Sequence, residues 1–183
     1  MRLKEQAIQS SRRWIETNAL ILDTETTGLD RNAEIVEAAV IDCQGSVLLD
    51  QRIRPVNPIP RRATEVHGIS DRDVADCPNW ADIHDSFVQL VDGRKMIIYN
   101  KSYDLRLLRQ SAAIFGLPEP VRGQNAECAM LTFAEFRHGY AGGRWFRLEA
   151  AARLMRVRKQ GRGHSALGDC RTTLGVIRAM AES

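Results

Sequence analysis

The stretch Ala19-Leu-Ile-Leu-Asp-Thr-Glu-Thr-Thr-Gly-Leu29 ends an apolar run with two acidic residues, Asp23 and Glu25. The run predicts a strand, in which residues i and i+2 project from the same face. Two carboxylates on one face repel each other unless protons or cations neutralise them, and Mg²⁺ or Mn²⁺ favours such all-oxygen ligands. Asp-x-Glu is a common tripeptide, so two solvated acids at a strand end are the simpler interpretation unless the chain supplies partners.

A third acidic residue follows a second apolar strand candidate. The segment Met96-Ile-Ile-Tyr-Asn-Lys-Ser-Tyr-Asp104 runs from that strand into a helical pattern. Asn100 is expected to cap the helix, which leaves Asp104 about one turn inside it. Asp104 would then lie near the carboxyl end of a buried strand, where open α/β sheets bind ligands. A favourable position near the positive end of the helix dipole is the alternative explanation for this acid.

The last predicted helix of the chain supplies a fourth acid and a histidine. It begins at about Ser165, and Asp169 lies beside its apolar stripe. His164 and Asp169 would lie about 140° apart on a continuous helix, so His164 must lie in or just before the first turn if both serve one site. The glycines Gly161 and Gly163 predict a mobile approach to this helix.

This set of four acids and one histidine resembles the DEDDh branch of the DnaQ-like 3′–5′ exonucleases, within the RNase H-like superfamily. The matching motifs are Asp23-Thr-Glu-Thr-Thr-Gly-Leu29, Val66-His-Gly-Ile-Ser70, Asn100-Lys-Ser-Tyr-Asp104 and His164-Ser-Ala-Leu-Gly-Asp169. The resemblance runs from about Ala19 to Ala181. Tyr99 departs from the pattern, because many members carry a histidine before the asparagine; that position is not a metal ligand in the family, so the departure bears on substrate contacts.

The resemblance implies a metal-dependent exonuclease that releases nucleoside 5′-monophosphates from the 3′ end of a nucleic acid. Two Mg²⁺ or Mn²⁺ ions would activate the attacking water and stabilise the departing 3′-oxygen. Their expected ligands are Asp23, Glu25, Asp104 and Asp169. His164 would be the general base that takes the proton of the water. The residues expected near the terminal nucleotide are Thr26, Gly28, Leu29, His67 and Asn100. For His67, a hydrogen bond at a helix end or in the core is an equal alternative.

The predicted elements follow the order of an α/β protein. The expected strands are Ala19–Glu25, Glu34–Asp42, Ser46–Arg54, Lys95–Tyr99 and Gln124–Cys128, and the expected helices include Leu3–Glu16, Arg61–Glu65, Asp71–Ala75 and Trp80–Val91. The resemblance implies an RNase H-like mixed sheet, with three antiparallel strands and then parallel strands, flanked by helices. We therefore expect an N-terminal helical extension over residues 1–18 and an exonuclease domain over residues 19–183.

Composition narrows the class of protein. The 183 residues suit one compact domain, no apolar stretch approaches membrane-spanning length, and the N-terminus lacks a signal-peptide pattern. Four scattered cysteines favour reduced thiols in the cytoplasm over a disulfide or zinc framework: Cys43, Cys77, Cys128 and Cys170.

The net charge of +3 by itself says little about partners, but basic residues gather just before His164: Arg153, Arg156, Arg158, Lys159 and Arg162. They form either a phosphate-binding segment or a solvated loop.

Two further features are interpreted without a metal role. Glu37, on the second strand candidate, is expected to pair with a basic neighbour or to support the site indirectly. In the glycine-rich segment His138-Gly-Tyr-Ala-Gly-Gly-Arg-Trp-Phe-Arg147, aromatic side chains could stack on unpaired bases. Trp145 or Phe146 is expected to anchor this segment to the core.

The alternatives come from other functional classes. A catalytically inactive module that binds nucleic acid or a polymerase is disfavoured because all four acids and the histidine are present. A phosphatase or RNase H-like endonuclease is disfavoured by His164-x-Ala-x-x-Asp169. The expected partner is a single-stranded 3′ end, with DNA favoured over RNA; an exoribonuclease remains an alternative. Proofreading would require a separate polymerase partner, and a repair partner is the other possibility.

Overall fold

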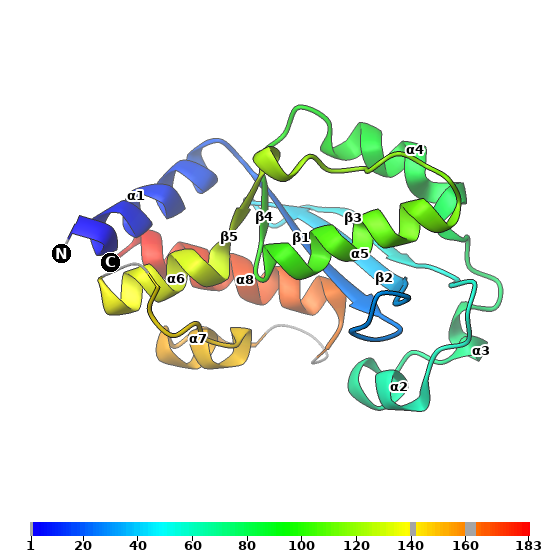
Figure 1. The fold of residues 1–183 in the computed structure, drawn as a ribbon. Coiled ribbons are helices and arrows are strands. Elements are labelled where there is room, and N and C mark those ends of the chain that lie inside the picture. Colours follow the sequence, from blue (N-terminus) through cyan, green and yellow to red (C-terminus); the bar gives the residue numbers. More distant parts are fainter. Residues whose placement is uncertain (1, 140–141, 160–163) are drawn as a thin grey trace.

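The computed structural model describes residues 2–139, 142–159 and 164–183, which fold around a five-stranded mixed sheet (Figure 1). The strands lie in the order β3-β2-β1-β4-β5. They are β1 (Leu20–Thr26), β2 (Ile35–Asp42), β3 (Val47–Arg52), β4 (Met96–Ile98) and β5 (Ala126–Cys128). Strands β1 to β3 are antiparallel, and β4 and β5 join β1 in parallel. The expected α/β sheet, antiparallel strands first and parallel strands after, is confirmed.

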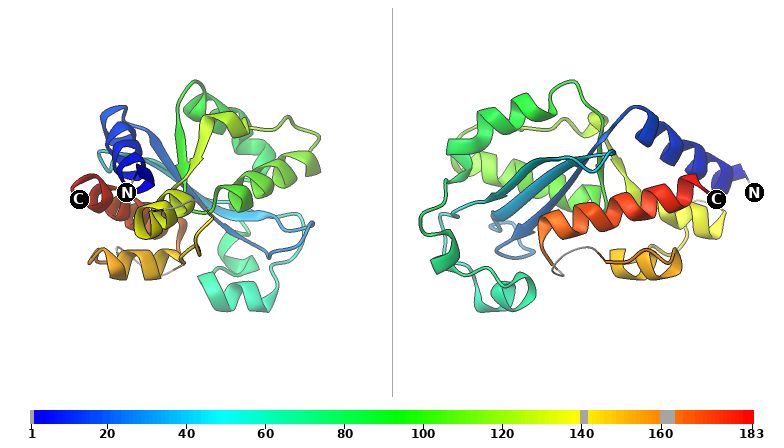
Figure 2. Two further views of the ribbon diagram at one scale, coloured as in Figure 1. Left: turned by 60° about the vertical axis from the view of Figure 1, so that its left-hand side comes forward. Right: turned by 180° about the vertical axis from the view of Figure 1, so that it is seen from behind.

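Helices cover both faces of the sheet (Figures 1 and 2). They are α1 (Arg2–Glu16), α2 (Arg61–His67), α3 (Asp71–Val74), α4 (Trp80–Val91), α5 (Lys101–Ile114), α6 (Ala129–His138), α7 (Leu148–Leu154) and α8 (Ala166–Ala181), with a 3₁₀ turn η1 (Gly123–Asn125). Helices α1, α6 and α8 share one apolar core with the sheet, and α4 and α5 share a second core on the other face. None of the helices in the described ranges has both the length and the apolar composition that crossing a bilayer requires.

Strand β1 decides which face carries the acids. Ile21 packs into the core under α8, whereas its neighbours Leu20 and Leu22 face α4 and α5. Because side chains alternate, Asp23 and Glu25 follow Ile21 on the face that α8 covers. Cys170 of α8 donates hydrogen bonds through its thiol to the Ile21 carbonyl, at 3.5 Å, and to the carbonyl of Ala39 in β2. The buried stripe of α8 therefore holds its first turn against the end of β1.

Helix α1 forms as expected and is packed into the main core. Ala7, Ile8 and Trp14 are buried, and Trp14 Nε1 donates to the Glu127 carboxylate in β5 at 2.9 Å. This packing is continuous with that of α6 and α8. The division into a 1–18 extension and a 19–183 domain stays a prediction.

Helix α7 was not predicted from the sequence. Only Ala151 and Ala152 are buried among its seven residues. An apolar pattern this short does not indicate a helix. Arg153 therefore belongs to a helix rather than to a basic loop, and Arg162 lies outside the described residues. Phe146, just before α7, stacks edge-on against Phe133 with ring centroids 5.3 Å apart, so it anchors the preceding segment as expected.

Candidate metal and nucleotide site

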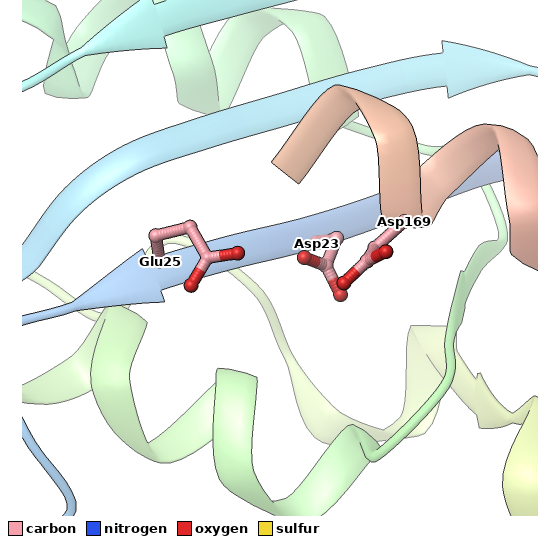
Figure 3. A group of neighbouring side chains, drawn as sticks. All are labelled: Asp23, Glu25 and Asp169. Atoms are coloured by element: carbon pink, nitrogen blue, oxygen red, sulfur yellow. The ribbon is translucent and has the colours of Figure 1, made fainter. Parts of the chain in front are cut away.

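Three of the four expected acids converge where α8 begins above the end of β1. One carboxylate oxygen from each of Asp23, Glu25 and Asp169 lies within 4.8 Å of the other two (Figure 3). The carboxylates of Asp23 and Asp169 approach each other, and Glu25 projects farther along β1 (Figure 3). Within the described ranges, Asp169 Oδ1 is a buried oxygen without a hydrogen-bond partner. An unsatisfied oxygen in an all-carboxylate group fits a divalent cation.

Asp104 lies beside this group rather than in it. Its Oδ1 accepts a hydrogen bond from Thr24 Oγ1 at 2.8 Å, in a buried position. Its negative charge nevertheless acts on Asp23, whose pKa is raised first by burial and next by Asp104. The fold thus places Asp104 in the first turn of α5, just after β4 as expected, and leaves it hydrogen-bonded to β1. Its place among the metal ligands stays a prediction.

Asn100 takes the expected position before α5 without the expected contact. It is the residue preceding the helix, but its side chain makes no capping hydrogen bond. Its backbone, with φ −124° and ψ 67°, departs from the extended conformation that capping residues usually adopt. The expectation of a side-chain cap is therefore wrong, and the exposed Asn100 side chain is available to a cavity next to it.

A cavity of about 740 Å³ opens beside Glu25, a size typical of small-molecule sites. All five residues expected near a terminal nucleotide line it: Thr26, Gly28, Leu29, His67 and Asn100. Helix α2 adds Arg62, Ala63 and Val66, and α5 adds Tyr103. Sequence reasoning did not assign Tyr103, although it stands directly before Asp104 in the same motif. The cavity and the carboxylate group share Glu25, so they form one continuous candidate site.

His67 makes the helix-end hydrogen bonds considered for it, and it also lines the cavity. The Ile69 N–H donates to His67 Nδ1 at 3.0 Å, so Nε2 carries the proton and donates to the Thr26 carbonyl at 3.2 Å. Burial lowers the pKa of His67, and the Thr26 carbonyl only partly opposes this. A neutral His67 therefore ties the end of α2 to β1 while one side lines the cavity.

Comparison with known proteins decides the family. The family model described as Exonuclease matches residues 20–177. This chain belongs to the exonuclease family. It is 40% identical over 181 residues to the protein of Escherichia phage 186 named Uncharacterized exonuclease CP81, covering 95% of this chain and 93% of that protein. It is 31% identical over 157 residues to DNA polymerase III subunit epsilon of Rickettsia felis, covering 82% of this chain and 68% of the subunit.

Among solved structures, the exonuclease is similar to Exonuclease X in complex with 5′ overhanging duplex DNA. The TM-score is 0.66 at 28% identity, and the match covers 90% of this chain and 92% of the other. Together with the relatives, this structure confirms the DnaQ-like family and the RNase H-like fold expected from the sequence motifs. The chain is therefore a nuclease.

His164 lies just before the first turn of α8, the position expected from its spacing to Asp169. It directly precedes Ser165, which caps α8 by accepting a hydrogen bond from Gly168 N, so it stands just before the first turn. His164 is exposed and has a left-handed φ of 56°, a conformation in which histidine is enriched. Burial raises the pKa of Asp169, and the positive charges of Lys159 and, to a smaller extent, His164 oppose this shift. The predicted mobility at Gly161 and Gly163 falls outside the described residues.

The carboxylates of the exonuclease bind protons unusually tightly when no cation is present. Burial, then the charges of Asp169 and Glu37, raise the pKa of Glu25 to about 8. Burial raises the pKa of Asp104 to about 7, although hydrogen bonds from Thr24 oppose the shift. Protons and cations thus compete for the same oxygens, and a divalent cation is the species that relieves the repulsion above neutral pH.

These shifts predict that the metal-free exonuclease loses stability as pH rises. A carboxyl group whose pKa is raised on folding contributes stability below its unfolded pKa and loses it as pH passes the folded value. For Asp104 and Glu25 the loss should accumulate from their ordinary pKa values, 3.8 and 4.5, and be complete by about pH 7 and about pH 8. Thermal unfolding in a chelator should show a midpoint about 5 °C lower near pH 9 than near pH 6. Millimolar Mg²⁺ should reduce this difference, and a midpoint that rises over the same interval would contradict the burial of these acids.

Glu37 supports the site without joining the carboxylate group. Its Oε2 accepts a hydrogen bond from the backbone N–H of Ala166 at 2.8 Å, at the first residue of α8. Its Oε1 lies 3.7 Å from Arg52 Nε, and Glu37 is the register partner of Glu25. The expectation of a basic neighbour is confirmed, and the indirect role stays a prediction. Buried Glu37 therefore joins the start of α8 to β2, directly opposite the candidate metal ligand Glu25 in β1.

We expect Glu37→Ala to destabilise the exonuclease by about 1–3 kcal/mol, because the buried Ala166 N–H loses its acceptor. Glu37→Gln keeps an acceptor oxygen and removes the charge, so it should cost clearly less. Thermal and urea unfolding of both variants, in the presence of Mg²⁺, measure the difference. Equal losses for the alanine and glutamine variants would show that the charge of Glu37, rather than its hydrogen bond, matters.

Proposed function

We propose that this exonuclease is a DEDDh 3′–5′ exonuclease that removes nucleoside 5′-monophosphates from single-stranded 3′ ends, with DNA favoured. The observation that carries the proposal is the meeting of Asp23, Glu25 and Asp169 beside a cavity lined by all five expected nucleotide-contact residues. The carboxylates offer a place for metal ions, and the cavity offers a place for one terminal nucleotide. A 3′ end in the cavity would place its last phosphodiester next to Glu25.

Asp23, Glu25, Asp104 and Asp169 would hold two Mg²⁺ or Mn²⁺ ions. Bound there, the ions would supply an activated water and charge stabilisation at the departing 3′-oxygen. Two observations support this assignment: Asp169 Oδ1 has no hydrogen-bond partner, and the pKa of Glu25 is raised. A bound cation would give the oxygen a partner and would offset the repulsion between the carboxylates. Asp104 would need to exchange its hydrogen bond with Thr24 for a metal contact, or share the two.

The remaining steps are performed by residues of the chain. His164, exposed at the start of α8, would accept the proton of the attacking water. Lys159 pairs with Glu149 at 3.5 Å, and its charge partly opposes the burial that raises the pKa of Glu25. Its ammonium group would attract substrate phosphate. Leu29 and His67 would contact the terminal nucleotide, and Thr26 would shape the turn beneath it.

The preference for DNA and the partners rest on the relatives. Subunit epsilon of Rickettsia felis belongs by name to DNA polymerase III, and the Exonuclease X structure contains DNA. We extend both to this chain as proposals: DNA as substrate, and a separate polymerase or repair protein as partner. The described cysteines are free thiols, which suits the proposed cytoplasmic setting.

Incubation with 5′-labelled single-stranded DNA or RNA tests the proposal. With Mg²⁺ or Mn²⁺ we expect a ladder that shortens from the 3′ end, disappears on chelation, and forms faster on DNA. Circular single-stranded DNA should stay intact, because it has no end. Internal cuts on the circle would favour an endonuclease, faster shortening of RNA would favour an exoribonuclease, and binding without cleavage would favour an inactive module.

A further inference from the structure

The loop between β1 and β2, residues 27–34, is held by side chains from one face of α5. These side chains, spaced three and four residues apart, form what we call the α5 clamp: Tyr103, Arg106 and Gln110. Arg106 donates hydrogen bonds to the carbonyl of Leu29 at 3.2 Å and to that of Asp30 at 3.0 Å. Gln110 donates to the carbonyls of Asp30, at 3.3 Å, and Ala33, at 2.9 Å. Arg106 and Gln110 also bind each other at 2.7 Å.

Tyr103 fixes the start of the same loop. Its hydroxyl lies 2.6 Å from Thr26 Oγ1 and 2.9 Å from the Gly28 carbonyl, and Thr26 Oγ1 donates to that carbonyl at 2.9 Å. Two hydroxyl hydrogens serve these three contacts, so one hydroxyl donates to the Gly28 carbonyl and the other donates to its neighbouring hydroxyl. The Arg106 guanidinium lies 5.2 Å from the Tyr103 ring centre, which links the two halves of the clamp.

The loop itself is closed at its base. Thr27 and Glu34 exchange two hydrogen bonds, Thr27 N to the Glu34 carbonyl and Glu34 N to Thr27 Oγ1, each 2.9 Å. The Leu29 side chain is nevertheless 78% exposed and lines the cavity. An apolar side chain that lines a cavity, on a loop whose backbone is already hydrogen-bonded, offers a ligand a preformed contact.

We infer that Tyr103, Arg106 and Gln110 are positioning residues that preform the Leu29 wall of the terminal-nucleotide cavity. A loop already ordered in the free enzyme does not have to be ordered when the nucleotide binds, so more of the contact energy appears as affinity. The clamp and the expected metal ligand Asp104 are on the same helix. Helix α5 therefore fixes the position of the cavity wall relative to the carboxylates. The inference rests on the proposed function, because it takes a nucleotide as the occupant of the cavity.

Loosening the clamp should weaken binding more than chemistry. Tyr103→Phe removes one oxygen and should raise KM for single-stranded DNA about 3- to 10-fold, with kcat within about 2-fold of wild type. Arg106→Met should act in the same direction. Arg178→Met is the matched control, because Arg178 also donates to a backbone carbonyl, that of Cys43, but in the last turn of α8. It should leave KM unchanged.

A double-mutant cycle separates positioning from general loss of structure. If the clamp acts through Leu29, Tyr103→Phe should raise KM by less than about 2-fold once Leu29→Ala is present. Additive effects of the two substitutions would overturn the inference. So would an unchanged KM in both Tyr103→Phe and Arg106→Met, with thermal unfolding showing that both variants are folded.

A binding measurement keeps this inference distinct from the proposed function. Calorimetric titration with thymidine 5′-monophosphate in Mn²⁺ should show Kd raised by the same factor as KM in the clamp variants. If wild type binds the nucleotide and the variants bind it more weakly, the clamp stands even where no shortening from the 3′ end is seen, and only the proposed function fails. If wild type degrades DNA but the nucleotide Kd is the same in all variants, the clamp fails and the proposed function stands.

Discussion

Replacing Asp23 with asparagine is expected to lower exonuclease activity by about 10³- to 10⁴-fold, the range that several kcal/mol of transition-state stabilisation represents. Asp23 contributes one of the three convergent oxygens, and its pKa is raised by burial and then by Asp104 and Asp169. Asp23 therefore lies close enough to the acids of β1, α5 and α8 to be repelled by all of them. The substitution keeps the shape of the side chain and removes its charge. The expected metal site therefore loses one of its carboxylate ligands.

Initial rates on 5′-labelled DNA, together with calorimetric binding of Mn²⁺, measure this effect. Asp50→Asn is the matched control, because Asp50 is exposed on the edge strand β3, and its activity should equal wild type. The metal-free Asp23→Asn protein should also unfold at a higher temperature than wild type, since a buried repulsive charge is gone. Activity above a tenth of wild type, with Mn²⁺ binding unchanged, would remove Asp23 from the metal site.

Substitution of His164 by alanine is the second large effect, a fall in kcat of about 10²- to 10⁴-fold with little change in Mn²⁺ affinity. His164 is outside the carboxylate group, exposed, and next to the cap of α8, so its loss should leave the acids in place. A general base contributes to the rate of proton transfer and not to the binding of cations.

The measurement is kcat at saturating DNA alongside a Mn²⁺ titration of each protein. Because His164 is exposed, added imidazole should restore part of the rate in His164→Ala, which loss of folding would not permit. Parallel loss of kcat and of Mn²⁺ affinity would instead make His164 a metal ligand or a structural residue.

Local patterns in the sequence predicted the strands, the helices other than α7, and the faces on which the acids lie. The period of two in β1 correctly predicted that Asp23 and Glu25 share a face, and the apolar stripe of α8 correctly predicted Asp169 beside the buried side. These patterns did not predict which partner a polar side chain would bind. The Asn100 side chain leaves the helix end uncapped, and Asp104 accepts a hydrogen bond from Thr24, a contact that no spacing along the chain could reveal.

By itself the sequence determined the order of the strands and of the helices other than α7, the identity of the acids, and the face of each element on which they lie, because backbone periodicity is a local property. Only the tertiary structure decided that Asp169 meets Asp23, that Glu37 binds the start of α8, and that the α5 clamp holds the loop after β1. Those contacts join residues far apart in the chain. They arise when apolar faces such as those of Ile21 and Cys170 are buried together, and this burial depends on the whole sheet rather than on any one segment.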